Sequence, residues 1–346
     1  MNYIGSKLSL LPFIEEVIED LLPPLDRAPI LCDMFTGTAA VAKHFKQKGF
    51  CVLANDIQHY SFITAKHFIS NNRMIRFETL REQGVEPFEF LNALPGQDGF
   101  LYHNYSPSGT KNQEFVRLYF SDANAKKIDA VRIRIEEWMK QSLLTEQEYS
   151  YLIASLLESA DRVANTASVY AAFLKRIKKT AEKDFVLTPL EVVLSERDCH
   201  AVFQKDANEL IRKIRGDILY LDPPYNTRKY DTNYHILETI ALYDDPQIKG
   251  KTGIRADGRK SKYTSKRGAK EALEDLIQHA SFPYILLSYN DEGILSIDEI
   301  ERIMSKYGSY SRRDKEYRRF KADRSGNRNH KKGSVVEYLH CLKKAP

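Results

Sequence analysis

The sequence predicts an α/β protein with one Rossmann-like, seven-stranded sheet and a mostly helical segment inserted into it. Two observations support this prediction. Short apolar runs alternate with segments of helical periodicity, and four of these runs lead into an acidic residue. Residues 57–195 interrupt the alternation and show no βα pattern of their own. A chain of 346 residues has room for one elaborated domain or for two.

The first 22 residues predict a helix, because apolar positions recur at intervals of three and four until Pro23-Pro24 ends the pattern. Gly5 and Ser6 precede this helix and present backbone donors at its amino terminus, a place that favours an anionic group. Ordinary helix capping explains the same two residues equally well.

Two strands follow, over 29–33 and 51–56, and each ends in a carboxylate. After Asp33 a turn of small residues contains Gly37, which allows a ligand to approach the backbone closely. Asp56 lies 23 positions after Asp33, where an acid at the next strand end can bind the two hydroxyls of a ribose. A plain strand-ending turn is the alternative at Asp56. The two features occur together at this spacing, and so we favour a nucleoside site.

The interrupting segment predicts a helical insert, so that residues 1–58 and 196–346 form one domain around an insert of residues 59–195. Helical periodicity is clearest in three stretches, 61–70, 122–140 and 146–180. After the insert the expected strands are 201–206, 218–221, 284–290, 316–320 and 335–342. The expected helices there are 207–214, 233–242, 271–279 and 296–305. Residues 246–270 have the composition of a mobile loop, rich in Gly, Ser, Lys and Arg.

Asp222-Pro223-Pro224-Tyr225 follows the apolar strand 218–221. A carboxylate at this end of a strand lies where open α/β sheets bind ligands. Two prolines stiffen the chain and remove two backbone donors, so the carbonyls stay free to accept. Tyr225 adds an aromatic face. A surface turn is the simpler reading, but a rigid acceptor pair beside a ring also suits a planar base with an exocyclic amino group.

Charge and cysteine usage narrow the classes of protein further. The net charge of +5 is concentrated in 249–270 and 311–332, which are typical of a phosphate-binding surface or of a plain solvated one. No apolar run approaches the roughly 20 residues of a membrane span, and the amino terminus has no signal-peptide layout, so we expect a cytoplasmic protein. The four cysteines are scattered in mostly apolar runs, which favours core thiols, and we expect no metal site.

The ordered motifs together resemble the amino-methylating DNA methyltransferases that depend on S-adenosylmethionine, in the adenine class related to Dam and FokI methylases. The resemblance covers about two thirds of the chain, including residues 161–175. It rests on Tyr3-Ile4-Gly5-Ser6-Lys7, Asp33-Met34-Phe35-Thr36-Gly37, Asn55-Asp56, Lys205-Asp206-Ala207, Asp222-Pro223-Pro224-Tyr225 and Leu287-Ser288-Tyr289-Asn290. The glycine turn departs from the pattern, because it holds one glycine where many members have two.

The resemblance implies a role for each matching residue. The cofactor, S-adenosylmethionine, would contact Tyr3, Lys7, Asp33, Phe35, Gly37, Asp56, Asp206, Ala207 and Asp222. Asp222 and the Pro223 carbonyl would accept the adenine N–H groups, and Tyr225 would stack on the base. Duplex DNA would contact Lys7, Arg162, Lys175, Arg228, Lys229, Tyr230, Lys262, Lys266, Arg267, Arg318, Arg319 and Arg328. The insert would be the target-recognition region.

Rival functions remain open at this point. Methylation of the cytosine amino group uses the same architecture, although Asp instead of Ser at position 222 argues against it. RNA and protein-glutamine methyltransferases usually have Asn at this position and lack so large an insert. A non-catalytic DNA-recognition protein of the same fold is a further alternative. We expect a monomer in the bacterial cytosol or nucleoid, and any cognate restriction endonuclease would be a separate chain.

Overall fold

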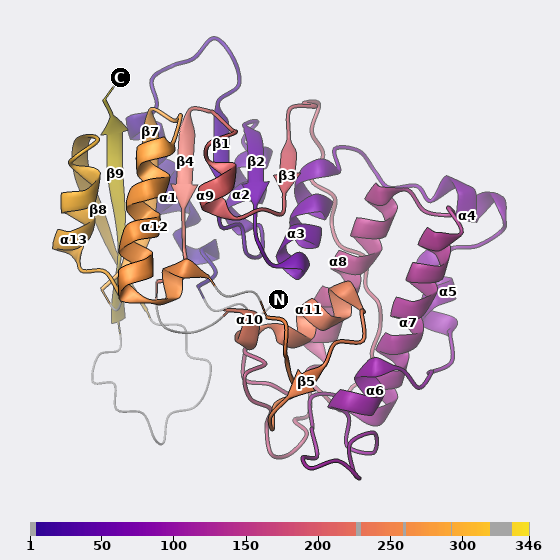
Figure 1. Ribbon diagram of the computed structural model, residues 1–346. Coiled ribbons are helices and arrows are strands. Elements are labelled where there is room, and N and C mark those ends of the chain that lie inside the picture. The colour runs from indigo at the N-terminus through magenta and orange to yellow at the C-terminus, as the bar shows by residue number, and fades with distance from the viewer. Residues whose placement is uncertain (1–4, 226–229, 259–260, 292, 319–333, 346) are drawn as a thin grey trace. The chain divides into compact units, whose positions relative to one another are not determined.

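The chain forms two compact units, a sheet unit and a helical unit. The computed structural model describes residues 5–225, 230–258, 261–291, 293–318 and 334–345 (Figure 1). The helical unit comprises residues 58–194 and 230–258, and the sheet unit comprises the other described residues. The sequence placed 230–258 in the same domain as the sheet, whereas its contacts are with the helical unit.

The sheet unit is built on seven strands, as predicted. In chain order they are β1 Ile30–Asp33, β2 Cys51–Asn55, β3 Ala201–Phe203, β4 Ile218–Leu221, β7 Tyr284–Asn290, β8 Gly308–Arg318 and β9 Ser334–Lys344. Their order across the sheet is β3-β2-β1-β4-β7-β9-β8. The first five are parallel neighbours, and β9 pairs antiparallel with both β7 and β8. The carboxyl ends of β1, β2, β3 and β4 therefore meet at one edge, which brings their acidic residues together.

Helices cover both faces of this sheet (Figure 1). They are α1 Leu11–Leu21, α2 Ala40–Gln47, α9 Ala207–Leu210, α12 Lys266–His279 and α13 Ile297–Met304. Helices α9, α12 and α13 share one apolar core with β4 and β7, to which Leu219, Leu276 and Ile300 contribute. Strand β4 is buried at every position, because a central parallel strand is covered on both faces.

The helical unit has its own apolar core, which includes Trp138, Leu156 and Ile240. Its helices are α3 His59–Ala65, α4 Glu78–Glu82, α5 Pro87–Ala93, α6 Phe100–Tyr105, α7 Asp122–Lys140, α8 Glu146–Arg162, α10 Tyr230–Asn233 and α11 His235–Leu242. A short hairpin joins β5 Ile248–Lys249 to β6 Ile254–Arg255. Helix α8 begins at a capping box, in which the Thr145 hydroxyl and the Glu148 carboxylate each accept the other's backbone N–H.

The first part of the expected mobile loop, residues 246–258, is instead held by buried side chains. Arg117 donates to the carbonyls of Gly250 and Lys251, at 3.1 and 3.2 Å. The Tyr105 hydroxyl donates to the Gly253 carbonyl at 2.8 Å. These partners lie far away in sequence, and so composition alone gave the wrong expectation for this segment.

Residues 163–180 are not helical, although their apolar spacing predicted a helix that continues to residue 180. The side chain of Asn165 explains the difference. Its amide donates to the Leu118 and Leu174 carbonyls, and its oxygen accepts the N–H of Lys178. These bonds give the backbone partners other than those of a helix.

Cys51 is not the free core thiol that the sequence suggested, because it forms a disulfide with Cys199 across 148 residues. The bond joins the start of β2 to the segment just before β3, beside the pairing of these two strands. Cys32 and Cys341 are buried free thiols, as expected. None of the described helices is long and apolar enough to cross a membrane.

Candidate active site

The turn after β1 is shaped by hydrogen bonds that leave one carboxylate oxygen of Asp33 without a partner. Gly37 has a φ of 55°, and its N–H donates to Oδ2 of Asp56 at 2.9 Å. Asp33 is buried, and its Oδ2 accepts the Ala42 N–H at 3.2 Å. Its Oδ1 is buried without a hydrogen-bond partner among the described residues. Burial, with the nearby charge of Asp222, raises the pKa of Asp33 to about 8.

Asn55 connects the turns after β1 and β3, a role that the sequence did not suggest. Its amide donates to the carbonyls of Met34 and Lys205, at 3.1 and 3.2 Å. Its oxygen accepts the Lys205 N–H at 3.0 Å. An amide that offers both donors and an acceptor can satisfy two separate backbone segments, so Asn55 fixes the relation between the two turns.

Asp206 is placed beside this edge, but one of its oxygens caps helix α9. Oδ1 accepts the N–H groups of Asn208 and Glu209, at 2.9 and 3.3 Å. Oδ2 lies 3.8 Å from Nζ of Lys262. A role for Asp206 or the backbone of Ala207 with the cofactor's adenine stays a prediction.

Asp222 lies directly after β4, in contact with a buried lysine from the start of the chain. Nζ of Lys7 is 3.2 Å from Oδ1 of Asp222 and 2.9 Å from Oε1 of Glu337. Burial opposes the charge on Lys7, but the two carboxylates outweigh it and raise the pKa of Lys7 well above its usual value. Burial raises the pKa of Asp222 to about 6, with Lys7 opposing the rise and Glu337 adding to it. Asp222 is therefore ionised at neutral pH.

The rest of the Asp-Pro-Pro-Tyr stretch is tightly packed. Pro223 and Tyr225 are buried, and the Tyr225 carbonyl accepts the Ile294 N–H at 2.7 Å. The Tyr225 ring meets the edge of Tyr289 at 5.8 Å between centroids, and Nζ of Lys7 lies 5.6 Å from its centre. An aromatic ring fixed in this way keeps its position before any ligand arrives.

The predicted DNA contacts are spread over both units. In the sheet unit Lys262, Lys266 and Arg267 are exposed and pair with acids, at 3.8, 3.4 and 2.9 Å. In the helical unit Lys175 is exposed and Arg162 lies at the end of α8. Tyr230 begins helix α10. Tyr3, Arg228, Lys229, Arg319 and Arg328, and the side chain of Arg318, lie outside the described residues.

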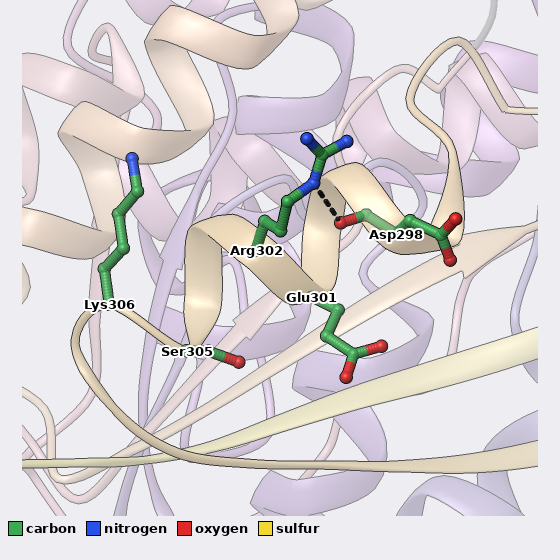
Figure 2. A pocket seen from close by; sticks show the side chains of 5 residues that line it. All are labelled: Asp298, Glu301, Arg302, Ser305 and Lys306. Carbon is green, nitrogen blue, oxygen red and sulfur yellow. Dashed lines mark hydrogen bonds between the residues drawn. The ribbon is translucent and has the colours of Figure 1, made fainter.

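A pocket on helix α13 is unrelated to this edge. Figure 2 shows its lining, which consists of Asp298, Glu301, Arg302, Ser305 and Lys306. Nε of Arg302 donates to the Asp298 carbonyl at 3.1 Å, and Lys306 pairs with Glu274 at 2.6 Å. These are exposed polar side chains of α13 and of the two residues that follow it. Across the described ranges, no group of three or more His, Cys, Asp or Glu residues could hold a metal ion.

Comparison with known families identifies the family to which this chain belongs. The model of the D12 class N6 adenine-specific DNA methyltransferases matches residues 3–303. The chain belongs to this family. The methyltransferase is 48% identical to the type II methyltransferase M.NlaIII of Neisseria lactamica, over 99% of both chains. It is 34% identical to M.CviAII of Paramecium bursaria Chlorella virus 1, over 98% of its own length and 97% of the relative's.

A longer relative matches over only part of its length. The methyltransferase is 39% identical to the type II methyltransferase M.FokI of Planomicrobium okeanokoites, over 99% of its own length and 53% of that protein. The expected family, fold class and adenine specificity are thus confirmed. Members of this family use S-adenosylmethionine, and the expected cofactor is confirmed in the same way.

The residues at the strand ends fit this cofactor. Asp33 Oδ1 and Asp222 Oδ1 are two buried carboxyl oxygens without a hydrogen bond from the described part of the chain, and they suit a ligand that carries polar groups. The left-handed Gly37 leaves its turn open to close approach. The individual contacts of Lys7, Asp33, Phe35, Gly37, Asp56 and Asp206 with the cofactor remain predictions.

Proposed function

We propose that this methyltransferase modifies one specific sequence in duplex DNA, and that it is the modification enzyme of a restriction–modification system. The relatives named type II methyltransferases support the second part. The basic segments on both units support DNA contacts, with Arg and Lys bound to phosphates and base edges read by other side chains. The protein would act in the cytoplasm as a monomer, with any restriction endonuclease as a separate chain.

The observation that carries the catalytic proposal is the position of the Asp222 carboxylate, directly after β4 and 3.2 Å from the Lys7 ammonium. The target adenine must leave the duplex to reach such a site. The Asp222 carboxylate and the Pro223 carbonyl would each accept one N–H of its amino group. The Tyr225 ring would stack on the base, a contact worth about 1–3 kcal/mol.

The chemistry explains why two acceptors are needed. The lone pair of the adenine amino nitrogen is delocalised into the ring, and so this nitrogen is a poor nucleophile. Two acceptors draw its N–H bonds out of the ring plane and direct the lone pair at the methyl group. S-adenosylmethionine supplies an electrophilic methyl group when it is bound. In-line transfer needs positioning more than a strong base, so Asp222 aligns the nitrogen and takes no proton before transfer.

The assignment is tested with cofactor that carries a tritiated methyl group. The protein is incubated with this cofactor and duplex DNA, the DNA is digested, and the labelled nucleoside is identified. N6-methyl-2′-deoxyadenosine is the expected product. Label on cytosine, or no label on DNA, would contradict the proposal. Sequencing modified bases in a host that expresses the protein gives the recognition sequence.

The rate of methyl transfer should fall as the pH drops through about 6, because this is the pKa of Asp222. Above this pH the carboxylate is ionised and accepts an N–H, whereas the protonated form loses acceptor capacity. Single-turnover rates with saturating cofactor and DNA measure the effect. Cofactor binding over the same pH range is the control, and a rate that stays constant through this range would rule out the role of Asp222.

A further inference from the structure

Glu337 is a wholly buried carboxylate on β9, next to the candidate active site. Its exposed fraction is 0%. It pairs with Asn290 of β7 and Lys315 of β8 in the sheet. It also lies beyond residues 3–303, which match the family model. A fully buried glutamate is rare without charged or hydrogen-bonding partners, so its contacts indicate its role.

Lys7 is shared between two carboxylates, but it makes an aligned hydrogen bond with only one. Nζ donates to Oε1 of Glu337 at 2.9 Å. The same nitrogen is 3.2 Å from Oδ1 of Asp222. That oxygen nevertheless has no aligned hydrogen-bond partner among the described residues. The Ser288 hydroxyl also donates to Oε1 of Glu337, which fixes the carboxylate from the β7 side.

This geometry separates the two effects that a lysine has on a carboxylate. The positive charge beside Asp222 keeps the carboxylate ionised, because the interaction of charges needs no alignment. Lys7 has three N–H groups, and the aligned hydrogen bond goes to Glu337, so Lys7 takes up at most part of the acceptor capacity of the Asp222 carboxylate. Methyl transfer to an amino group requires both conditions at Asp222.

We propose that Glu337 is a positioning residue for methyl transfer, which holds the Lys7 ammonium so that Asp222 stays free to accept the adenine amino group. This inference rests on the proposed role of Asp222. Glu337 acts through Lys7 and does not touch the base or the cofactor. The amide of a Glu337→Gln variant has the same shape but no charge. The Lys7 ammonium then turns to Asp222 and competes with the substrate amino group.

The Glu337→Gln variant should lower the single-turnover rate of methyl transfer about tenfold or more, because small misplacements at a reacting centre have large effects. The affinity for the cofactor should stay within about twofold. The substitution changes how the adenine amino group is aligned for transfer, and it does not change how the cofactor is bound. The matched control is Glu316→Gln, the same substitution at an exposed position of β8, which should react at the wild-type rate. A Glu337→Gln rate within about twofold of wild type would overturn the proposal.

The pH dependence of the methyl-transfer rate provides a second test. It would not change if Glu337 only stabilised the fold. The groups that act on the charge of Asp222 are Lys7, Asp33, Tyr220 and Glu337. The charge of Glu337 raises the pKa of Asp222 and Lys7 lowers it. Glu337→Gln should therefore move the acid limb of the rate to lower pH. A slower variant with an unmoved acid limb would count against the proposal.

A double variant covers the case in which Glu337→Gln folds poorly. Lys7→Met with Glu337→Gln removes both members of the buried pair, which proteins tolerate better than removal of one. It should be no slower than Lys7→Met alone, because without Lys7 the Glu337 carboxylate has no ammonium to hold. A further loss in the double variant would overturn the proposal. If Asp222→Ala retains activity, the proposed site itself fails; if only the Glu337 variants behave as wild type, this inference alone fails.

Discussion

The Asp222→Ala variant is expected to bind S-adenosylmethionine nearly as well as the wild type and to transfer no measurable methyl group to DNA. The substitution removes the acceptor that orients the adenine amino nitrogen, while the turn after β1 keeps its own hydrogen bonds. Loss of a preorganised group at the reacting centre slows a reaction by about a hundredfold to a thousandfold or more. Single-turnover transfer of labelled methyl groups measures the rate, and calorimetry measures cofactor binding.

Two further variants make this result specific. Asp298→Ala removes an exposed carboxylate of the same sheet unit, on α13 (Figure 2), and should react at the wild-type rate. Asp222→Asn keeps an acceptor oxygen but loses the charge beside Lys7, and should be intermediate. Wild-type activity in Asp222→Ala would show that the acceptor lies elsewhere. Loss of both activity and cofactor binding would show that Asp222 serves the cofactor first.

The largest effect on stability is expected from Arg132→Met in the helical unit. Arg132 is buried on α7, and its guanidinium donates to the carbonyls of Ile240 and Ala241 at the end of α11, at 2.9 and 3.0 Å. It also pairs with Glu136 at 2.9 Å. Methionine leaves these acceptors without a donor, which should destabilise the unit by about 3–5 kcal/mol.

Denaturant unfolding followed by tryptophan fluorescence measures this change. Trp138 is the single tryptophan of the chain and lies buried on α7, so it reports on the helical unit. The control is Arg134→Met on the same helix, which removes an exposed pair with Glu137 and should cost less than about 1 kcal/mol. Equal midpoints for Arg132→Met and the wild type would mean that α11 is held by apolar packing alone.

Arg132 also explains why residues 230–258 belong to the helical unit. Asp129, one turn earlier on α7, accepts the Tyr243 hydroxyl at 2.7 Å, just after α11. Together with Arg117, these side chains of the insert hold a segment that follows the sheet strand β4 in the chain. The predicted boundary followed chain order, whereas the compact unit follows these distant contacts. Assignment of the helical unit to target recognition remains a prediction.

The spacing of apolar residues predicted the bounds of a helix or strand correctly where one face of that element is buried along its whole length. Helix α7 spans the predicted residues 122–140, because its apolar spacing matches one buried stripe. Strand β7 likewise spans the predicted residues 284–290. The same reasoning failed for residues 163–180, where the side chain of Asn165 satisfies backbone groups that a helix would have paired.

For the candidate site, the sequence by itself determined which acids stand at the strand ends, because Asp33, Asp56, Asp206 and Asp222 each follow a short apolar run. Their order also indicated the methyltransferase family. Only the tertiary structure showed which side chains lie next to these carboxylates and how burial and charge shift their pKa values. Lys7 and Glu337 are 330 positions apart, and no local pattern relates them. Their contact exists because β9 pairs with β7 beside β4, and it places the Lys7 ammonium 3.2 Å from Asp222.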